Sequence, residues 1–205
     1  MKHDGLTSVE RILKSAIREF SRYGYDGARI DRIASLAKIN KAMIYYHFKN
    51  KEALYERILI DIYEKIYAVV IGDITEVSQS DQIYDIISRF VNFTGSIDPE
   101  FGRLMLREIS SGGKYFKKLA IPKLILPTLS VVMNLYDKGK KQNRFREVDP
   151  VYTHMQVIGA VVFFNILRIT LEGTDLHKMV FRENHLENYR NNLISIIKHG
   201  IEKHE

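Results

Sequence analysis

Residues 30–48 read IDRIASLAKINKAMIYYHF, and this stretch decides the fold of the N-terminal part of the chain. Its apolar residues recur at helical spacing on both sides of a short polar segment, which predicts two short helices over 29–37 and 41–46. Asn40 stands where the second helix needs an N-cap oxygen. Ala34 is small enough to let Ile44 approach closely, so we expect a helix-turn-helix. Its inner face comprises Ile30, Ile33, Ala34, Ala37, Ile39 and Ile44.

Further helices are predicted on both sides of this pair. Upstream, a helix from about Ser8 to Arg22 begins with a capping box of Thr7 and Glu10 and ends at Gly24. Downstream, a long helix begins after Asn50 and runs to about residue 71. Period-two alternation is hard to find, so the predicted fold class is all-α. The remaining helices are expected at 81–95, 99–111, 115–140, 150–171 and 184–199.

The prolines mark helix starts and one break. Asp98-Pro99 and Asp149-Pro150 each place an acid at the N-cap and a proline at the first helical position, where the missing N–H costs nothing. Pro122 and Pro127 lie inside the helix expected at 115–140. They should kink or split it, because each removes a backbone donor.

The composition excludes several classes of protein. The 205 residues are 45% hydrophobic and 27% charged, as in an ordinary globular protein, and none is cysteine, which excludes disulfides and thiolate zinc sites. No phosphate-binding loop, zinc-protease motif or nucleophile elbow is present, so we expect no enzyme, no cofactor and no metal. The N-terminus lacks a signal peptide and the apolar stretch at 157–167 is too short to cross a bilayer, so we expect a cytoplasmic protein without a membrane contact.

Positive charge gathers at the N-terminus. Residues 1–52 hold eleven Lys and Arg against six Asp and Glu, whereas the remainder holds twenty against nineteen. A basic segment beside a neutral one is expected when one part of a protein meets phosphates. A merely solvated basic surface would give the same count.

Several spaced motifs resemble the TetR family of bacterial regulators. They are Gly24-Tyr25, Ile33-Ala34, Ala37, Tyr45-Tyr46-His47-Phe48 and Lys51-Glu52-x-Leu54, and they cover about residues 8–55. The resemblance implies an N-terminal three-helix DNA-binding domain, which we place at 1–52. It also implies a larger helical domain at 53–205 that binds an inducer and pairs two protomers.

Two positions depart from the family pattern. The family usually has Ser or Thr at Ala28, where it caps the second helix and contacts a phosphate, and Gly at Lys38 in the turn. Ala28 cannot cap through its side chain, so Arg29 is the candidate that replaces the phosphate contact with its charge. Lys38 must adopt a left-handed conformation at a cost of about 1 kcal/mol or more, or the turn is built differently.

The recognition helix presents its N-terminal residues and outer face to the major groove. Lys41 can read guanine or hold a phosphate, and Ala42 and Met43 offer apolar contacts to thymine methyl groups. The hydroxyls of Tyr45 and Tyr46 suit phosphates or base edges, although a core position for Tyr45 fits equally well. The expected DNA contacts are Arg29, Lys41, Ala42, Met43, Tyr45, Tyr46, His47 and Lys51.

Two of these contacts rest on other arguments. The resemblance places His47 at a phosphate-contacting position, although a structural hydrogen bond is an alternative. Lys51 begins the long helix, where its charge and the positive helix terminus can together hold a phosphate.

The second half of the chain is rich in large apolar groups, most of which must form a core. In a regulator of this family some of them would line an inducer cavity, and methionine beside aromatic rings suits an apolar or planar ligand. Asn165 and Arg168 either orient such a ligand or face a second protomer. The candidate ligand contacts are Phe90, Phe93, Met105, Phe116, Met133, Tyr136, His154, Met155, Phe163, Asn165 and Arg168.

The sequence also suggests what the protein assembles with. We expect a homodimer on a palindromic double-stranded DNA operator, paired through the helices at 150–171 and 184–199. The stripe expected to meet the partner comprises Leu186, Tyr189, Leu193, Ile196 and Ile197. We expect the basic run Lys138–Arg146 to be a solvated helix end. The main alternative to a repressor released by an inducer is a helical DNA-binding dimer that acts constitutively or through a protein partner.

Overall fold

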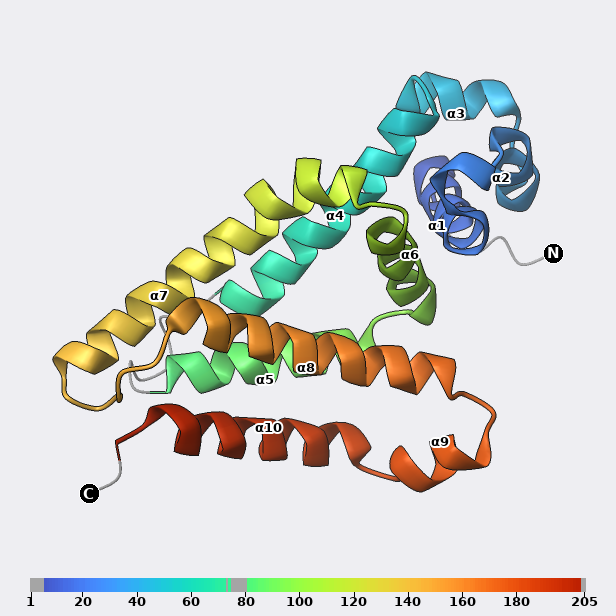
Figure 1. Ribbon diagram of the computed structural model, residues 1–205. Helices are drawn as coiled ribbons and strands as arrows, with labels where there is room; N and C mark the ends of the chain where they lie inside the picture. Colours follow the sequence, from blue (N-terminus) through green and yellow to red (C-terminus); the bar gives the residue numbers. More distant parts are fainter. Residues whose placement is uncertain (1–5, 73, 75–80, 204–205) are drawn as a thin grey trace. The chain divides into compact units, whose positions relative to one another are not determined.

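The computed structural model describes residues 6–72, 74 and 81–203, and within them the chain is built from helices (Figure 1). The fold class predicted from the sequence is therefore confirmed. The helices are α1 (Ser8–Gly27), α2 (Ile30–Ala37), α3 (Lys41–Phe48), α4 (Lys51–Ile71), α5 (Gln82–Ser96), α6 (Pro99–Ser110), the π-helix η2 (Phe116–Ile125), α7 (Leu126–Lys141), α8 (Pro150–Thr170), α9 (Asp175–Val180) and α10 (His185–Ile201).

The predicted helix starts are confirmed by their hydrogen bonds. Thr7 and Glu10 form the full capping box at α1. Asp98 accepts the N–H of Glu100 at 2.9 Å, and Asp149 accepts the N–H of Val151 at 2.8 Å. Sequence reasoning missed α9, because six residues are too few to show a helical period.

The predicted breaks also appear, with one difference in kind. The regular helix α1 is interrupted at Gly24, which has φ 69° and ψ −179°, and one further turn follows it. Pro122 does not kink an α-helix but lies inside η2, and Pro127 occupies the first turn of α7. A proline is tolerated in a first helical turn because that N–H has no intrahelical partner.

The chain packs as two compact units. The first contains the described residues up to Tyr63 together with Asp98–Lys123, and the second contains Glu64–Ile97 and Leu124–Glu205 as far as they are described. Helix α6 therefore packs in the same unit as the helix-turn-helix, where it lies along α1, and the Arg107 guanidinium donates to the Ser21 carbonyl at 2.6 Å. The functional division at residues 52 and 53 stays a prediction.

The core of the first unit joins α1, the helix-turn-helix and the start of α4. Phe20 packs edge-on against Tyr55 with ring centres 4.7 Å apart. Ala34 and Ile44 are both buried, as the close crossing of α2 and α3 requires. The other buried side chains include Ile12, Ala16, Ile33, Leu54 and Ile58.

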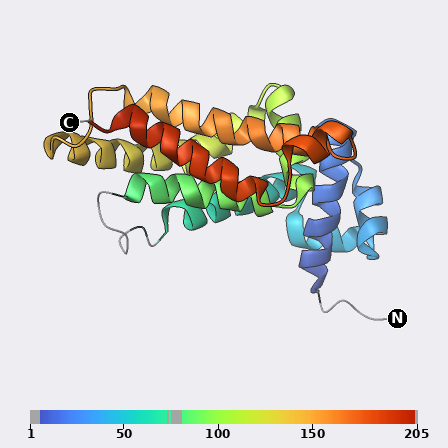
Figure 2. The same ribbon diagram turned by 90° about the horizontal axis from the view of Figure 1, so that it is seen from below.

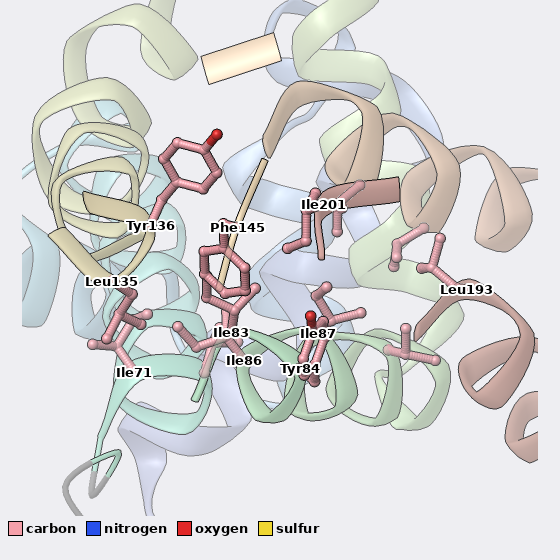
Figure 3. Close-up of a cluster of buried hydrophobic side chains, with 14 residues drawn as sticks. Ile71, Ile83, Tyr84, Ile86, Ile87, Leu135, Tyr136, Phe145, Leu193 and Ile201 are labelled. Carbon is pink, nitrogen blue, oxygen red and sulfur yellow. The ribbon is translucent and has the colours of Figure 1, made fainter. Parts of the chain in front are cut away.

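The core of the second unit is centred on α5 (Figure 3). Helix α5 lies beside both α8 and α10, as Figure 2 also shows. The Phe145 ring lies against Gly139, where a Cβ atom would come within 2.2 Å of it, so a larger residue cannot be accommodated there without a shift. Tyr136 stacks on Phe145, and its hydroxyl accepts the Val148 N–H at 2.7 Å.

Two helical stretches are long and apolar enough to span a bilayer by length and composition, namely Phe116–Lys141 and Pro150–Thr170. This corrects the expectation drawn from residues 157–167, because helix α8 extends well beyond that stretch on both sides. Core helices of soluble proteins meet the same two criteria, so the finding is weak support for a membrane protein.

The end of α10 is tied to the loop between α7 and α8. Arg146 donates its backbone N–H to the Ile201 carbonyl and Lys203 donates to the Arg144 carbonyl, each at 2.9 Å. The Arg144 guanidinium pairs with Glu202 at 2.6 Å, and the Tyr84 hydroxyl donates to the same carboxylate at 2.9 Å. The expectation of a solvated helix end and loop is thus wrong for Arg144, which is half-buried, and for Phe145, which is buried, whereas Arg146 is exposed.

Glu202 should make this connection sensitive to pH. Burial alone would raise the pKa of Glu202, but hydrogen bonds from Arg144 and Tyr84 outweigh it and hold the pKa below its ordinary value of 4.5. A carboxyl group whose pKa is lower in the folded state stabilises the fold above its unfolded pKa, and this contribution is lost as the pH falls.

We predict that Glu202→Gln lowers the free energy of unfolding by about 1–2 kcal/mol at pH 7, because the charged hydrogen bond to Arg144 is lost. The difference from the wild type should shrink in thermal or urea unfolding as the pH falls below 4.5. Glu147→Gln is the matched control, since Glu147 pairs with Lys140 at the exposed surface and should matter little. A difference that persists unchanged at pH 3 would contradict the prediction.

Candidate nucleic-acid interface

The start of α2 is held by a buried acid on α1. Glu19 is 2% exposed and accepts the backbone N–H of Arg29 at 3.0 Å, while its carboxylate pairs with Arg32 at 2.6 Å. The Ala28 side chain is buried and Arg29, the N-cap residue, makes no side-chain cap. Glu19 therefore satisfies the N–H of the N-cap residue itself, the group that an acid at the third helical position accepts in a capping box, and the Arg29 side chain stays exposed.

The turn between α2 and α3 takes the left-handed form. Lys38 has φ 54° and ψ 50° and donates its N–H to the Ser35 carbonyl at 3.1 Å. The first of the two alternatives considered for this departure from the family pattern is thus confirmed. Asn40 then caps α3 by accepting the Ala42 N–H at 2.9 Å, as its position in the sequence predicts.

Helix α3 turns only two side chains inward. Ile44 and Phe48, four residues apart, are buried, while the other six residues from Lys41 to His47 are exposed. Tyr46 is 81% exposed, and Tyr45 also reaches the surface, so the core reading of Tyr45 is wrong. Six neighbouring exposed residues on a short, well-anchored helix are the arrangement that a recognition helix needs.

Lys41, the first residue of α3, is already paired. Its ammonium lies 2.8 Å from one carboxylate oxygen of Asp31 on α2 and 3.1 Å from the other. This hydrogen bond raises the pKa of Lys41 and lowers that of Asp31. The pair joins the two helices of the motif on their exposed side, and sequence reasoning did not foresee it.

His47 and Lys51 lie in different surroundings. The His47 ring is exposed, contacts the edge of Tyr46, and makes no hydrogen bond within the part of the chain that the structure describes. The Lys51 ammonium lies 4.7 Å from the centre of the Tyr25 ring and donates to the Asp26 carbonyl at 3.2 Å. Partial burial lowers the pKa of Lys51.

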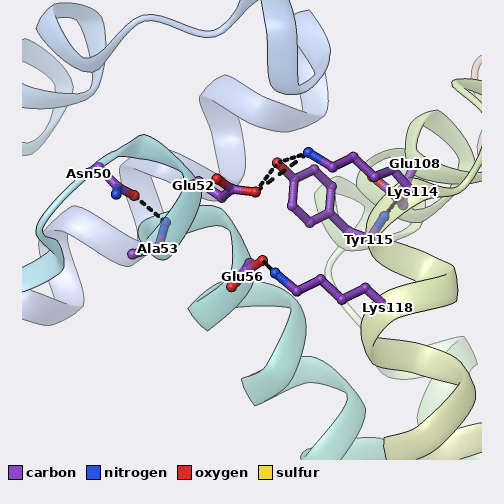
Figure 4. Close-up of polar contacts among 8 residues, drawn as sticks. All are labelled: Asn50, Glu52, Ala53, Glu56, Glu108, Lys114, Tyr115 and Lys118. Atoms are coloured by element: carbon purple, nitrogen blue, oxygen red, sulfur yellow. Dashed lines mark hydrogen bonds and ion pairs between the residues drawn. The ribbon is translucent and has the colours of Figure 1, made fainter.

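The first turns of α4 are clasped by the residues that lead into η2 (Figure 4). Tyr115 donates its hydroxyl hydrogen to Glu52 at 3.1 Å, and Lys114 lies 3.5 Å from the same carboxylate. One turn further along, Lys118 pairs with Glu56. We name Glu52, Glu56, Lys114, Tyr115 and Lys118 the α4–η2 clasp. Asn50 caps α4 by accepting the Ala53 N–H at 2.7 Å.

A second buried acid lies behind the clasp. Glu108 on α6 accepts the backbone N–H groups of Tyr115 and Phe116 at 2.7 and 3.0 Å and the Tyr55 hydroxyl at 3.0 Å. It is buried, and three donors replace the water that it has lost. No local sequence signal marks Glu108, because its partner Tyr55 lies 53 residues away.

The candidate ligand residues do not form one group. Met105 and Phe116 belong to the first unit, whereas the other nine belong to the second. Met155 and Phe163 are 61% and 59% exposed on α8, Met133 is also exposed, and Tyr136 is a core residue whose hydroxyl bonds the loop at 146–148. Phe90 and Phe93 are half-buried on α5. The candidates chosen from the sequence thus include exposed, half-buried and buried side chains.

The polar candidates on α8 differ in how their hydrogen bonds are met. Asn165 donates to the Thr94 hydroxyl at 3.2 Å, which ties α8 to α5, and accepts from Arg168. The Nε2 atom of His154 is buried without a partner among the described residues, and burial lowers the pKa of this imidazole. His154 is therefore neutral at pH 7 and has hydrogen-bonding capacity to spare.

The stripe expected on α10 to meet a second protomer is mostly wrong. Leu193 is buried, and Leu186, Tyr189 and Ile197 pack against the core of the same unit, because α10 lies on α5. Only Ile196 is exposed. The exposed apolar stripe lies on α8 instead and comprises Tyr152, Met155, Val162 and Phe163.

Within the described residues, no group of three or more His, Asp or Glu side chains could hold a metal ion. The exposed face of α3 in the first unit has a recognisable chemistry, that of a protein surface suited to a DNA groove.

Comparison with known proteins agrees with this geometry. The family model described as "Bacterial regulatory proteins, tetR family" matches residues 12–58. The chain is 28% identical over 167 residues to the HTH-type transcriptional repressor NicS of Pseudomonas putida, covering 80% of this chain and 78% of that protein. It is 31% identical over 83 residues to the IcaR regulator of the biofilm operon of Staphylococcus aureus, covering 40% of this chain and 45% of that one.

Solved structures share the fold over nearly the whole chain. A tetR family regulator from a Shewanella species matches with a TM-score of 0.69 and 12% identity, covering 97% of this chain and all of the other. A regulator from Saccharomonospora viridis, solved in complex with choline, matches with a TM-score of 0.71 and 19% identity, covering 96% and 98%. Residues 12–58 thus match the DNA-binding motif of the tetR family of bacterial regulatory proteins, and the whole chain shares the fold of solved structures that carry this family description.

Proposed function

We propose that this protein is a ligand-responsive transcriptional repressor, which binds a palindromic operator as a homodimer and is released by a small molecule. The observation that carries the proposal is the helix α3, which buries only Ile44 and Phe48 and exposes its other side chains. The names of NicS and IcaR, a repressor and a negative regulator, support repression. We expect the protein to act in the cytoplasm, where its DNA lies.

The DNA contacts divide into two kinds. Arg29, His47 and Lys51 are placed to hold phosphates, while Ala42 and Met43 offer apolar contacts to bases. Tyr45 and Tyr46 can reach either, and Lys41 can read guanine or hold a phosphate. The cation of Lys51 is presented at the start of α4, where the helix terminus adds to its attraction for an anion.

We predict that binding to duplex DNA depends strongly on salt. Arg29 and Lys51 supply two phosphate-binding cations per protomer, so affinity should fall by about two orders of magnitude between 50 and 200 mM salt. Lys51→Ala should weaken operator and random DNA alike, and Met43→Ala should mainly weaken the operator. Fluorescence anisotropy over a salt series measures both effects. A salt slope near zero would reject DNA binding through phosphates.

The exposed stripe on α8 is the surface that we assign to the partner protomer. Met155 and Phe163 lie on the same face of α8 as Tyr152, and Gly159 between them has open space around it, which allows a second helix to approach. Large exposed apolar patches of this kind mark interfaces. The dimers that bind DNA in this family support the same assignment.

We predict that Phe163→Asp converts a dimer into a monomer at micromolar concentration, because it buries a charge in the interface. Light scattering measures the change. Leu126→Asp is the matched control, since Leu126 is also exposed and apolar but lies on α7 away from this stripe. A wild-type monomer, or two variants with the same mass, would contradict the proposed interface.

Ligand binding is assigned to the second unit, and the His154 imidazole, whose Nε2 atom is buried without a partner among the described residues, is its best-supported polar contact. The choline held by the Saccharomonospora viridis protein is a precedent for a small ligand in this fold. Phe90, Phe93 and Asn165 remain candidates beside His154. For tenfold weaker DNA binding, the ligand must favour the DNA-incompetent state by about 1.4 kcal/mol.

We predict that a compound found by thermal shift among apolar and aromatic molecules binds more weakly when operator DNA is present, by the factor with which it weakens DNA binding. His154→Ala should reduce its affinity without changing the DNA affinity of the free protein, and Gln156→Ala, which alters an exposed residue of the same helix, should not. Calorimetric titration with and without operator measures this. Equal affinities would exclude coupling and leave a constitutive or protein-regulated DNA-binding dimer.

A further inference from the structure

Asp31 places a negative charge on the exposed side of the helix-turn-helix. Its side chain is 72% exposed, and its partner Lys41 is 44% exposed. The pair is formed between α2 and α3 and not within one helix, so the carboxylate contacts the first side chain of α3.

The position of Asp31 in α2 accounts for only part of this arrangement. An acid in the first turn of a helix is stabilised by the helix dipole, and Asp31 is the only acidic residue in that turn. The dipole does not require a contact with Lys41. An exposed carboxylate beside Arg29 and Lys41 also repels every phosphate that these cations attract, which weakens DNA binding.

We propose that Asp31 is a specificity-determining residue, which holds the Lys41 ammonium away from phosphates and directs it to a base edge. This inference rests on the proposed function, because it assumes that α3 enters a DNA groove. Lys41 then contributes to binding only where a guanine offers its O6 and N7 atoms. On random DNA the same pair prevents Lys41 from binding a phosphate, and the Asp31 carboxylate repels the phosphates nearby.

A simple charge effect would change the affinity for operator DNA and the affinity for random DNA together, whereas the proposed role of Asp31 changes them differently. Removing any acid from the first unit should strengthen binding to all DNA through the net charge. Removing Asp31 should in addition free Lys41 to neutralise a phosphate, and this strengthens random binding while the operator loses a directed contact.

The decisive comparison is Asp31→Asn with Asp61→Asn. Both remove one negative charge at nearly constant volume, and both break an exposed pair, since Asp61 lies 2.7 Å from Arg57 on α4. Affinity for operator and for random duplex is measured by anisotropy over a salt series. Circular dichroism melting checks that each variant is folded.

We expect Asp31→Asn to raise random affinity about tenfold at 0.1 M salt and to steepen the random-DNA salt slope by about 0.9 for each protomer. Operator affinity should stay constant or fall, so that the ratio of operator to random affinity decreases. Asp61→Asn should leave this ratio unchanged. Equal effects of the two variants on both DNAs would overturn the inference.

Lys41→Ala tests the same idea without changing Asp31. If the pair keeps Lys41 off phosphates, this variant weakens operator binding about tenfold or more while random affinity and its salt slope hardly change. An equal loss on both DNAs would show that Lys41 is an ordinary phosphate contact. Absence of any duplex binding by the wild type would instead reject the proposed function, so the two failures are distinguishable.

Discussion

The packing of the helix-turn-helix depends on the buried carboxylate of Glu19. Glu19 is buried on α1, and burial of an anion is costly unless donors surround it. Its donors, the Arg29 backbone and the Arg32 guanidinium, both come from the start of α2. These hydrogen bonds connect α2 to α1 beside the apolar core, and α3 packs on α2, where Ala34 and Ile44 are both buried.

The same device recurs at the other end of the first unit. Glu108 is buried on α6 and receives its donors from the chain that leads into η2 and from Tyr55 of α4. In both places a glutamate on one helix satisfies N–H groups at the start of another. The acceptor thus comes from another helix and not from a local cap, so that the helix start and the packing of two helices are stabilised together.

The features that could be predicted from the sequence are those with local causes. The caps at Thr7, Asn40, Asp98 and Asp149 act within three residues of themselves, whereas the sequence left the conformation of Lys38 open between two alternatives. Partners far apart in sequence, such as Glu52 with Tyr115, leave no such signal.

The apolar stripes of α8 and α10 show the same limit. The spacing of apolar residues predicts that a helix has an apolar face, but it does not indicate whether the same chain or another molecule covers that face. The α10 stripe packs on α5, whereas part of the α8 face is open.

If a second copy covers the open face of α8, as proposed, the amount of active protein depends on its concentration in the cell. An apolar stripe that a second copy covers adds the free energy of association to that of folding, so dilution loosens the protomer as well as separating the pair. Below the dissociation constant of the pair, the concentration of dimers falls with the square of the total concentration. Occupancy of a palindromic site would then respond more steeply to synthesis and degradation of the protein than a monomer could achieve.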